Sequence, residues 1–277
     1  MPTARRPECG ASRSAANSAL RLTVLGSGTS MGVPTLGCPC RVCHSNDPRD
    51  KRTRPSVLLS YGERNVVIDT TPDFRFQALR ADLQRLDAVV FTHAHADHIL
   101  GFDDIRPFNM RQKSHLPVYG SSETLATLQR IFAYVFDDTP AVSTIPQVKL
   151  HAIDGPFDPF GAELVPVQAR HGPLEVLGFR FGRGAYLTDF SSLPEESKPL
   201  LLGLDDLILD ALRDTPHPMH QTVAQALELV AELQPQRAWF THICHDLPHE
   251  ETNHRLRALG HPHVQLAFDG LSFEVTL

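Results

Sequence analysis

The feature that most limits how this chain can fold is the heptapeptide THAHADH at residues 92–98, which follows directly on the apolar run Ala88–Phe91. The apolar run predicts a buried strand, so the polar residues begin where that strand ends. Four potential metal ligands within six residues cannot all face one way on a helix or a strand, but a loop can turn them inward together. Imidazole and carboxylate groups are ligands that divalent metals accept. The motif therefore predicts two adjacent metal sites, with one pair of ligands for each: His93 with His95, and Asp97 with His98.

Two metal ions need more ligands than one loop supplies, and further candidates stand where other predicted strands end: Asp69, His171, Asp189 and His242. Asp189 follows the predicted strand Ala185–Thr188, and a carboxylate there could bridge the two ions. Any one of these residues alone is more often a capping group or a polar group satisfied in the core. Their shared position at strand ends favours interpreting them as one set.

The composition argues against several classes of protein. The chain has 277 residues with 26 Lys and Arg against 32 Asp and Glu, so its formal net charge of −6 argues against a chain-wide electrostatic grip on nucleic acid. No apolar run approaches the roughly 18 residues that a membrane span needs, and residues 1–19 lack the apolar segment of a signal peptide. We therefore expect a cytoplasmic protein with a disordered tail over 1–19 and one folded domain over 20–277.

Hydrophobic patterning divides the chain into two similar halves. Each half has a predicted strand that ends in Asp and a later strand that ends in Thr-His: Asp69 then Thr92-His93, and Asp189 then Thr241-His242. Helices are predicted from Ser121 or Ser122 to about Phe136, over Gln221–Leu233 and over Glu250–Leu259, and a closing hairpin over Val264–Phe268 and Leu271–Val275. Two such halves indicate two sheets packed face to face with helices outside.

The order of these motifs resembles that of the metallo-β-lactamase superfamily, over about residues 20–277. The resemblance implies an α/β fold, the four-layer αββα sandwich, with a two-metal site along one edge of its sheets. It implies one metal held by His93, His95 and His171, and a second held by Asp97, His98 and His242. It further implies that Asp189 bridges the two metals, while Asp69 holds the loop through hydrogen bonds.

A second motif, GCPCRVC at residues 37–43, presents Cys38, Cys40 and Cys43 close together. Three thiolates at this spacing suit a structural zinc ion that needs a fourth ligand. His44 qualifies by proximity, whereas Cys244 and His245 are distant candidates that would pin the loop to the C-terminal half of the chain.

The cysteine motif, together with GSGTSMGVP at 26–34 and THICH at 241–245, is similar to the PhnP-like branch of the superfamily. That branch consists of phosphodiesterases of the carbon–phosphorus lyase pathway, which act on phosphoribosyl cyclic phosphate. The similarity implies His245 as the fourth zinc ligand, and His220 as a group that protonates the leaving oxygen, with His217 as the alternative. It also implies a homodimer.

We therefore expect hydrolysis of a small or cyclic phosphodiester by a metal-bridging hydroxide, with His220 and Asp97 as catalytic residues. The expected cofactors are two divalent metals, Mn²⁺ or Zn²⁺, and one structural Zn²⁺. The expected partner is the small phosphodiester, with no nucleic acid and no membrane. Arg106 either contacts the substrate phosphate or pairs with Asp103 or Asp104.

Three other functions remain open at this point. The same metals serve tRNA 3′-processing endonucleases and thioester or lactone hydrolases of the same superfamily. The first is disfavoured by the lack of a long inserted arm and of a basic excess, and the second does not share the cysteine motif. A non-catalytic, metal-binding accessory protein is the third alternative. The complete ligand set argues against it, because a bridging carboxylate at Asp189 has little use without two ions.

Overall fold

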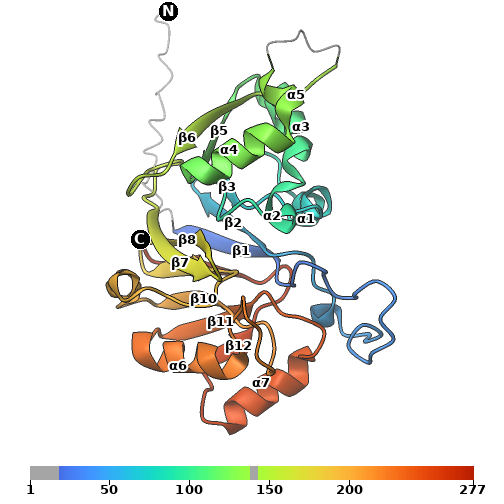
Figure 1. Cartoon of the computed structure of the whole chain (residues 1–277), viewed down its shortest axis with the longest axis vertical. Coiled ribbons are helices and arrows are strands. Elements are labelled where there is room, and N and C mark those ends of the chain that lie inside the picture. The colour runs from blue at the N-terminus through green and yellow to red at the C-terminus, as the bar shows by residue number, and fades with distance from the viewer. Residues whose placement is uncertain (1–18, 138–142) are drawn as a thin grey trace, which may run out of the picture.

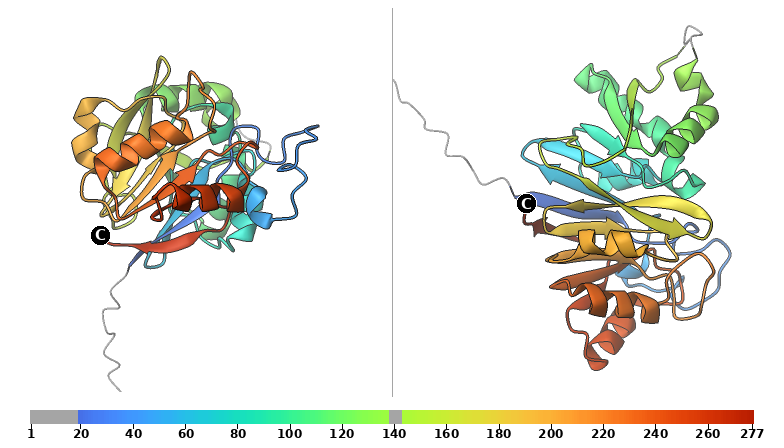
Figure 2. Two further views of the ribbon diagram at one scale, coloured as in Figure 1. Left: turned by 90° about the horizontal axis from the view of Figure 1, so that it is seen from below. Right: turned by 60° about the vertical axis from the view of Figure 1, so that its left-hand side comes forward.

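Two β-sheets lie face to face at the centre of the molecule, and helices cover both outer faces (Figures 1 and 2). The computed structural model describes residues 19–137 and 143–277, so nearly all of the tail predicted over 1–19 lies outside the described residues. Within the described residues, no helix is long and apolar enough to cross a membrane.

The first sheet is built mainly from the N-terminal half and takes its edge strand from the end of the chain. Its strands follow the order β13 (Ser272–Val275), β1 (Leu20–Gly26), β2 (Ser56–Tyr61), β3 (Arg64–Ile68), β4 (Ala88–Val90), β5 (Leu116–Gly120), β6 (Val148–Ala152). Strands β3 to β6 run parallel to one another, so their carboxyl ends meet at one edge.

The second sheet comes from the C-terminal half. Its order is β12 (Val264–Leu266), β11 (Arg237–Thr241), β10 (Asp206–Asp210), β9 (Gly184–Leu187), β8 (Leu174–Phe181), β7 (Val165–His171). Strands β9 to β12 are parallel, and β7 and β8 form an antiparallel pair beside them. Both sheets therefore present the carboxyl ends of parallel strands.

Alternating apolar residues produce the layers, because neighbouring side chains of a strand point to opposite faces. On β2, Val57 and Leu59 enter the core between the sheets, whereas Leu58 packs against the helices outside. A third core lies between the second sheet and its helices and includes Val230 and Leu256. Three cores between four layers confirm the predicted αββα sandwich.

The helices on the first sheet are α1 (Phe74–Arg80), α2 (Ala96–Ile99), α3 (Arg106–Gln112), α4 (Ser122–Ile131) and α5 (Ala133–Phe136). Those on the second are α6 (Val223–Leu233) and α7 (His249–Ala258), and short 3₁₀ helices cover Pro48–Asp50, Phe102–Ile105 and Glu195–Leu201. The helix predicted from 121 to 136 is two helices, because the backbone at Phe132 leaves helical geometry (φ −106°, ψ 42°).

The predicted closing hairpin is wrong. Strand β12 pairs in parallel with β11 in the second sheet, and β13 pairs antiparallel with β1 in the first. The chain crosses between the sheets at Asp269, whose carboxylate accepts hydrogen bonds from the backbone N–H groups of Ser27 (2.9 Å) and Thr53 (2.8 Å). These bonds fix the crossing, which a hydrophobic pattern alone does not distinguish from a hairpin turn.

Candidate metal centre

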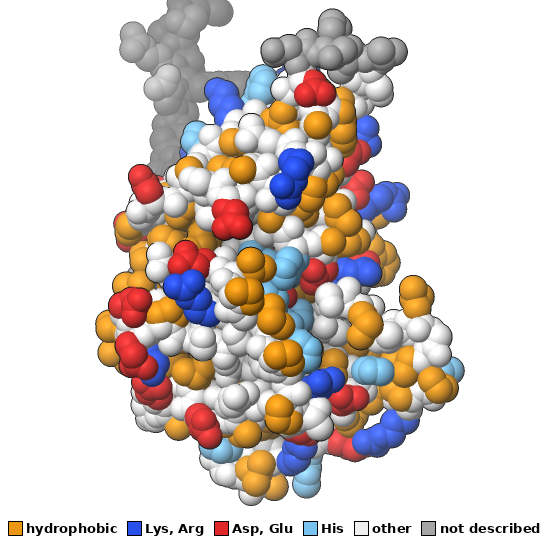
Figure 3. All heavy atoms as spheres, viewed as in Figure 1, with side chains coloured by type: hydrophobic (Ala, Val, Ile, Leu, Met, Phe, Trp, Pro, Cys, Tyr) orange, Lys and Arg blue, Asp and Glu red, His pale blue; other side chains and the backbone are white. Residues whose placement is uncertain are grey.

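The sequence-predicted ligands meet where the carboxyl ends of the parallel strands of both sheets come together. His93 and Asp97 follow β4, Asp189 follows β9, and His242 follows β11. Figure 3 shows His side chains gathered in a band at the middle of one face, with hydrophobic side chains beside them. The fold thus brings residues far apart in the sequence to one edge of the sandwich.

The first group consists of His93, His95 and His171, and one side-chain nitrogen of each lies within 4.8 Å of the others. The ring centroids of His93 and His95 are 4.5 Å apart, and those of His95 and His171 are 5.1 Å apart. Nδ1 of His171 bonds to the carbonyl oxygen of Met219 at 2.9 Å, which fixes the ring and leaves Nε2 for a ligand.

The second group is centred on the carboxylate of Asp189. Its Oδ2 lies 3.3 Å from Nε2 of His98, and its Oδ1 lies 3.2 Å from Nε2 of His242. Asp97 approaches the same His98 nitrogen at 3.3 Å through Oδ2. Asp189 therefore stands between the residues that the sequence assigns to one metal, and it also groups with His93 of the first set.

Buried polar atoms that have no hydrogen-bond partner indicate whether this site fits metal ions. Several buried atoms at this edge make none within the described residues, among them Nε2 of His93, His98 and His242, and Oδ2 of Asp97. Leaving a buried polar atom unpaired costs about 1–3 kcal/mol, so such atoms are uncommon. Nitrogen and carboxylate oxygen are ligands of divalent cations, and the unpaired atoms converge. The residues present fit the metals that the sequence predicts.

Burial keeps three of the imidazoles neutral. It lowers the pKa of His93 well below its usual value, lowers the pKa of His171 to about 4, and lowers the pKa of His242. A neutral imidazole offers a nitrogen lone pair to a metal without first losing a proton.

His98 differs because carboxylates surround it. Burial disfavours its charged form, but the charges of Asp189, Asp97 and Asp69 outweigh burial and raise the pKa of His98 well above its usual value. The site therefore has an excess of negative charge. A divalent cation would offset the same charge that otherwise favours a proton on His98.

Asp69 makes three hydrogen bonds to the motif loop, the contacts that the family resemblance implies for it. The backbone N–H of Thr92 donates to Oδ1 at 2.9 Å, and the Thr92 hydroxyl donates to Oδ2 at 2.8 Å. Nδ1 of His98 lies 2.7 Å from Oδ2. Asp69 and His98 are both fully buried. Because Asp69 contacts Nδ1 of His98, Nε2 is the nitrogen that faces Asp97 and Asp189.

The backbone at three of these strand ends is left-handed at residues other than glycine. The φ angles are 68° at Asp69, 53° at Asp189 and 57° at His242. This conformation costs roughly 1–2 kcal/mol for a residue with a Cβ atom. It turns the chain sharply at the end of a strand, which is where these side chains have to face the site.

Asp210, at the end of β10, is a residue that the sequence analysis missed. Its Oδ2 lies 2.9 Å from Nδ1 of His220 and also accepts a bond from the backbone N–H of Phe190 at 3.3 Å. The His220 ring stacks on His242 with a centroid separation of 4.4 Å. The signal that could have found Asp210 is its position, since it ends a strand whose parallel neighbour ends in Thr241-His242.

Two choices left open by the sequence concern the role of Arg106 and whether His220 or His217 is the acid. Arg106 pairs with Asp103 at 2.6 Å, and its guanidinium also bonds to the carbonyl of Thr144. Of its two expected roles, the structure therefore supports ion pairing and not a phosphate contact. His217 lies beside His220 with ring centroids 5.0 Å apart, but His220 is the one that contacts Asp210.

The cysteine motif meets His245, whereas His44 is exposed. The sulfur atoms of Cys38, Cys40 and Cys43 lie 3.1, 3.5 and 3.6 Å from Nδ1 of His245. A backbone N–H from Cys43 lowers the pKa of Cys40 to about 6, which favours the thiolate. This four-residue cluster fits a tetrahedral zinc ion.

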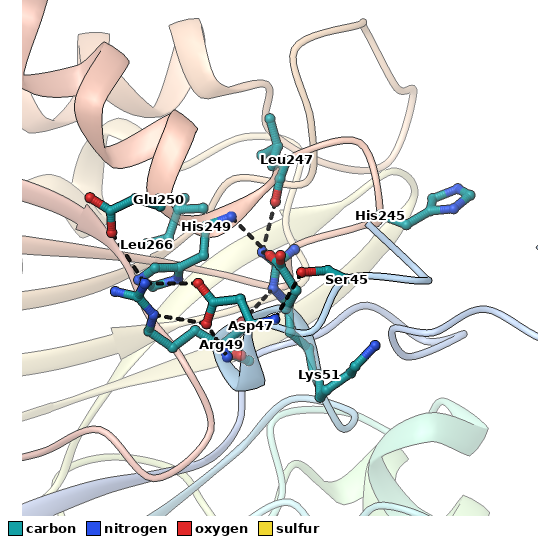
Figure 4. Close-up of polar contacts among 12 residues, drawn as sticks. Ser45, Asp47, Arg49, Lys51, His245, Leu247, His249, Glu250 and Leu266 are labelled. Carbon is teal, nitrogen blue, oxygen red and sulfur yellow. Dashed lines mark hydrogen bonds and ion pairs between the residues drawn. The ribbon is translucent and has the colours of Figure 1, made fainter. Parts of the chain in front are cut away.

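A buried arginine joins the cysteine loop to the segment that carries His245. Arg52 bonds to the carbonyl oxygens of Cys244 (2.8 Å) and Leu247 (2.7 Å) and pairs with Asp50 at 3.1 Å. Asp50 in turn accepts a bond from the backbone N–H of His249 at 2.8 Å. Figure 4 labels Leu247 and His249 together with His245 on the same C-terminal segment. The network fixes the position of His245 relative to the cysteines.

Comparison with known proteins gives consistent matches. Residues 64–243 match the family model of the beta-lactamase superfamily domain. The solved structure of a diphosphatase from the PhnP family has a TM-score of 0.86 at 49% sequence identity, covering 93% of this chain and 98% of that chain. Zinc-bound PqqB from Methylobacterium extorquens shares the fold, with a TM-score of 0.77 at 19% identity over 92% of this chain and 100% of that one.

One curated relative has a different kind of name. The octanoyltransferase of Porphyromonas gingivalis is 38% identical over 257 residues, which cover 91% of this chain and 51% of that protein. The chain spans about half the length of the curated relatives it matches first.

Proposed function

Because the chain belongs to the metallo-β-lactamase superfamily and, within it, to the PhnP family, we propose that it is a metal-dependent hydrolase of a small or cyclic phosphodiester. The observation that carries the proposal is the convergence of unpaired, buried nitrogen and carboxylate atoms around Asp189. Such a site suits a reaction in which negative charge builds up on phosphoryl oxygens.

We assign the metals to the residues that the sequence predicts. One cation would be held by His93, His95 and His171, and the other by Asp97, His98 and His242, with Asp189 shared between them. When bound, two divalent cations make water available as a nucleophile at neutral pH and offset the charge of the phosphoryl oxygens. Manganese or zinc would serve at this site.

The chain's own contribution to bond cleavage is a proton for the leaving oxygen. Asp210 contacts Nδ1 of His220 at 2.9 Å, which leaves Nε2 as the nitrogen that can reach a substrate. Burial lowers the pKa of His220, so the charged ring gives up its proton readily. We therefore propose His220 as the general acid and Asp210 as its positioning residue.

We propose a separate, structural role for the cysteine cluster. A zinc ion bound by Cys38, Cys40, Cys43 and His245 would join residues that lie 202 or more positions apart in the chain. Because His245 follows His242 by three residues, the ion would help to hold the C-terminal ligand segment in place.

The name of the PhnP-family relative supports a second candidate substrate, a disubstituted diphosphate. Phosphorus in such a diphosphate carries two bridging oxygens, as it does in a phosphodiester, so the same site can bind either. Acyl transfer, the activity in the name of the octanoyltransferase, is not carried over, because about half of that protein lies outside the match.

The test compares wild type with His95→Ala in hydrolysis of bis(p-nitrophenyl) phosphate with added manganese or zinc. We expect the variant to lose activity by two orders of magnitude or more, with an unchanged circular dichroism spectrum. His254→Ala is the matched control, since His254 is exposed on α7, and it should behave as wild type. Metal analysis should give about three divalent ions per chain.

A wider substrate panel then separates the alternatives. It contains a 2′,3′-cyclic nucleotide, a disubstituted diphosphate such as ADP-ribose, a tRNA precursor and an octanoyl thioester. Full activity of His95→Ala on bis(p-nitrophenyl) phosphate would contradict the proposal. Turnover of the thioester alone would contradict it as well, because the site would then serve carbonyl chemistry.

A further inference from the structure

A cavity of about 190 Å³ opens directly beside His93 and His95, and the proposed reaction does not use its far wall. The wall comes from the first two turns of α4 and from the first two residues of β8. We call this cavity the α4 pocket. Its polar lining includes Glu123, Thr124 and Thr127 from the helix and Glu175 from β8, and Leu174 of the same strand adds an apolar surface.

The α4 pocket is continuous with the candidate metal centre. His93 lines it and is buried, and its Nε2 has no hydrogen-bond partner among the described residues. A substrate whose phosphoryl group lies against His93 and His95 therefore has to place one of its substituents in this pocket or outside the protein. The chemistry of the lining then decides which substituent fits.

The lining carries negative charge and hydroxyl groups. No lysine or arginine is among the described residues that line the pocket, which include the carboxylates of Glu123 and Glu175. Arg170, just outside, pairs with Glu175 at 2.9 Å, whereas Glu123 has no ion pair within the described part of the chain. A second phosphate in the pocket would lie beside like charge, with no guanidinium or ammonium group of the lining to bind it.

The hydroxyl groups identify the ligand class further. The Ser121 hydroxyl donates to Oγ1 of Thr124 at 2.9 Å, so the proton of Thr124 remains free to be donated. Glutamates accept hydrogen bonds, and threonines both donate and accept them. The side chain of Leu174 beside them is 37% exposed, so it offers an apolar contact surface. Sugar hydroxyls use both kinds of partner, and the C–H face of a sugar packs on an apolar side chain, whereas an ammonium group uses acceptors only.

We infer that the α4 pocket binds a neutral, hydroxyl-bearing substituent of the substrate, such as a sugar, and disfavours a substituent that carries a second phosphate. The inference rests on the proposed function, since it assigns a substrate class to the same site. A substrate with an additional phosphate would have to place that group outside this pocket.

The experiment uses the metal-loaded enzyme and four diesters that all release p-nitrophenol. They are bis(p-nitrophenyl) phosphate, thymidine 5′-(p-nitrophenyl phosphate), the same nucleotide with a 3′-phosphate, and p-nitrophenyl phosphorylcholine. We expect the 3′-phosphate to lower kcat/KM about fivefold to tenfold relative to the unphosphorylated nucleotide, the size expected for like charges roughly 4 Å apart that are screened by water, as at the exposed Glu123. The loss should appear mainly in KM.

Variants of Glu123 then connect the preference to the pocket. Glu123→Gln should reduce the penalty for the 3′-phosphate, and Glu123→Lys should abolish or reverse it, because the charge of one wall changes sign. Glu63→Gln, on an exposed turn between β2 and β3, is the matched control and should leave the ratio unchanged. Both positions are exposed, so all three variants should fold.

The outcomes distinguish failure of the proposed hydrolase function from failure of the α4 pocket assignment. If wild type cleaves none of the four diesters, the proposed function fails. If it cleaves them but the 3′-phosphate carries no penalty, or Glu123→Lys leaves the ratio unchanged, the α4 pocket assignment alone is wrong. Faster cleavage of the phosphorylcholine ester than of the thymidine ester would also overturn it, because the pocket would then select a cation.

Discussion

Asp69 and Asp210 occupy similar positions in the two halves of the molecule, yet their carboxylates are used differently. Asp69 directly follows β3 and Asp210 ends β10, each beside a parallel strand that leads into Thr-His, and both are fully buried. Asp69 receives bonds on both oxygens from Thr92 and His98. Asp210 contacts His220 and the Phe190 backbone through Oδ2 only, and its Oδ1 has no partner among the described residues.

The difference shows how one topology provides two functions at the same edge. A carboxylate with both oxygens bonded fixes its neighbours, so Asp69 suits the orientation of a ligand ring. Burial and the nearby charge of Asp189 raise the pKa of Asp210 well above its usual value, which reflects a carboxylate with few donors. Such a group gains stabilisation when the imidazole beside it becomes charged.

The largest effect is expected for Asp69→Asn. An amide cannot accept from Thr92 and His98 at once without aiming its own N–H₂ at one of these donors, so the His98 ring loses its orientation. Metal affinity and kcat/KM should each fall about 10–100-fold. Metal analysis after dialysis and the bis(p-nitrophenyl) phosphate assay measure the two quantities.

Asp154→Asn is the control for this change, because Asp154 is exposed. It should leave metal content and activity unaltered. An Asp69→Asn enzyme that keeps its metals and its full rate would show that the three hydrogen bonds are dispensable. The proposed difference in role between Asp69 and Asp210 would then be wrong.

Asp210→Asn should have a smaller effect that depends on the leaving group. An alcohol needs a proton when it leaves, whereas p-nitrophenolate hardly does, so weakening His220 should matter only for the alcohol. We expect kcat to fall about tenfold or more on a 2′,3′-cyclic nucleotide and to change little on bis(p-nitrophenyl) phosphate, with metal content retained.

The leaving-group dependence distinguishes this role from a structural one. A carboxylate that merely supports the fold would, when replaced, slow both substrates equally or release metal. Either result for Asp210→Asn would assign it the same kind of role as Asp69.

The smallest effects compare helix caps in the two halves. In the first half, Ser121 Oγ accepts from the backbone N–H of Thr124 at 3.1 Å. In the second, Thr222 and Gln225 bond to each other reciprocally, at 3.2 Å and 2.9 Å. Each cap contributes about 1 kcal/mol, so Ser121→Ala and Thr222→Ala should each lower the free energy of unfolding by about that amount.

The reciprocal pair should make Thr222→Ala the more costly of the two. Gln225 then loses the hydroxyl that helps to hold its side chain against the backbone N–H of Thr222, a second backbone bond that the Ser121 cap does not have. Urea unfolding of the metal-loaded proteins gives both values. Equal losses, or a larger one for Ser121→Ala, would show that the capping box adds no stability here.

Local patterns predicted most elements, and their failures have tertiary causes. The helix predicted over Gln221–Leu233 appears as α6, Val223–Leu233, because its apolar residues recur at helical spacing on one face. The closing strands were assigned to one hairpin, since patterning does not indicate which sheet a strand joins. Helix α4 ends at Ile131 although apolar residues continue at Val135, because the backbone bends at Phe132.

The candidate site was predictable in its ligand types and less so in its supporting contacts. The sequence pointed to His93, His95 and Asp189 because unusual residues cluster at strand ends. Asp210 was not singled out, because its signal is its place beside the strand that leads into Thr241-His242, and that pairing is known only from the fold. The carbonyl of Met219, which bonds to His171, has no sequence signature at all, because every residue carries a carbonyl group.

The left-handed backbone at Asp69, Asp189 and His242 has a consequence for attempts to make this protein more heat-resistant. Glycine and asparagine adopt that conformation with less strain, so a library selected for thermal survival alone would enrich them at these three positions. The survivors would gain stability by discarding the side chains around which the site is built. Selection for thermal stability alone would thus remove the side chains of the candidate metal centre at the three positions where the backbone favours another residue.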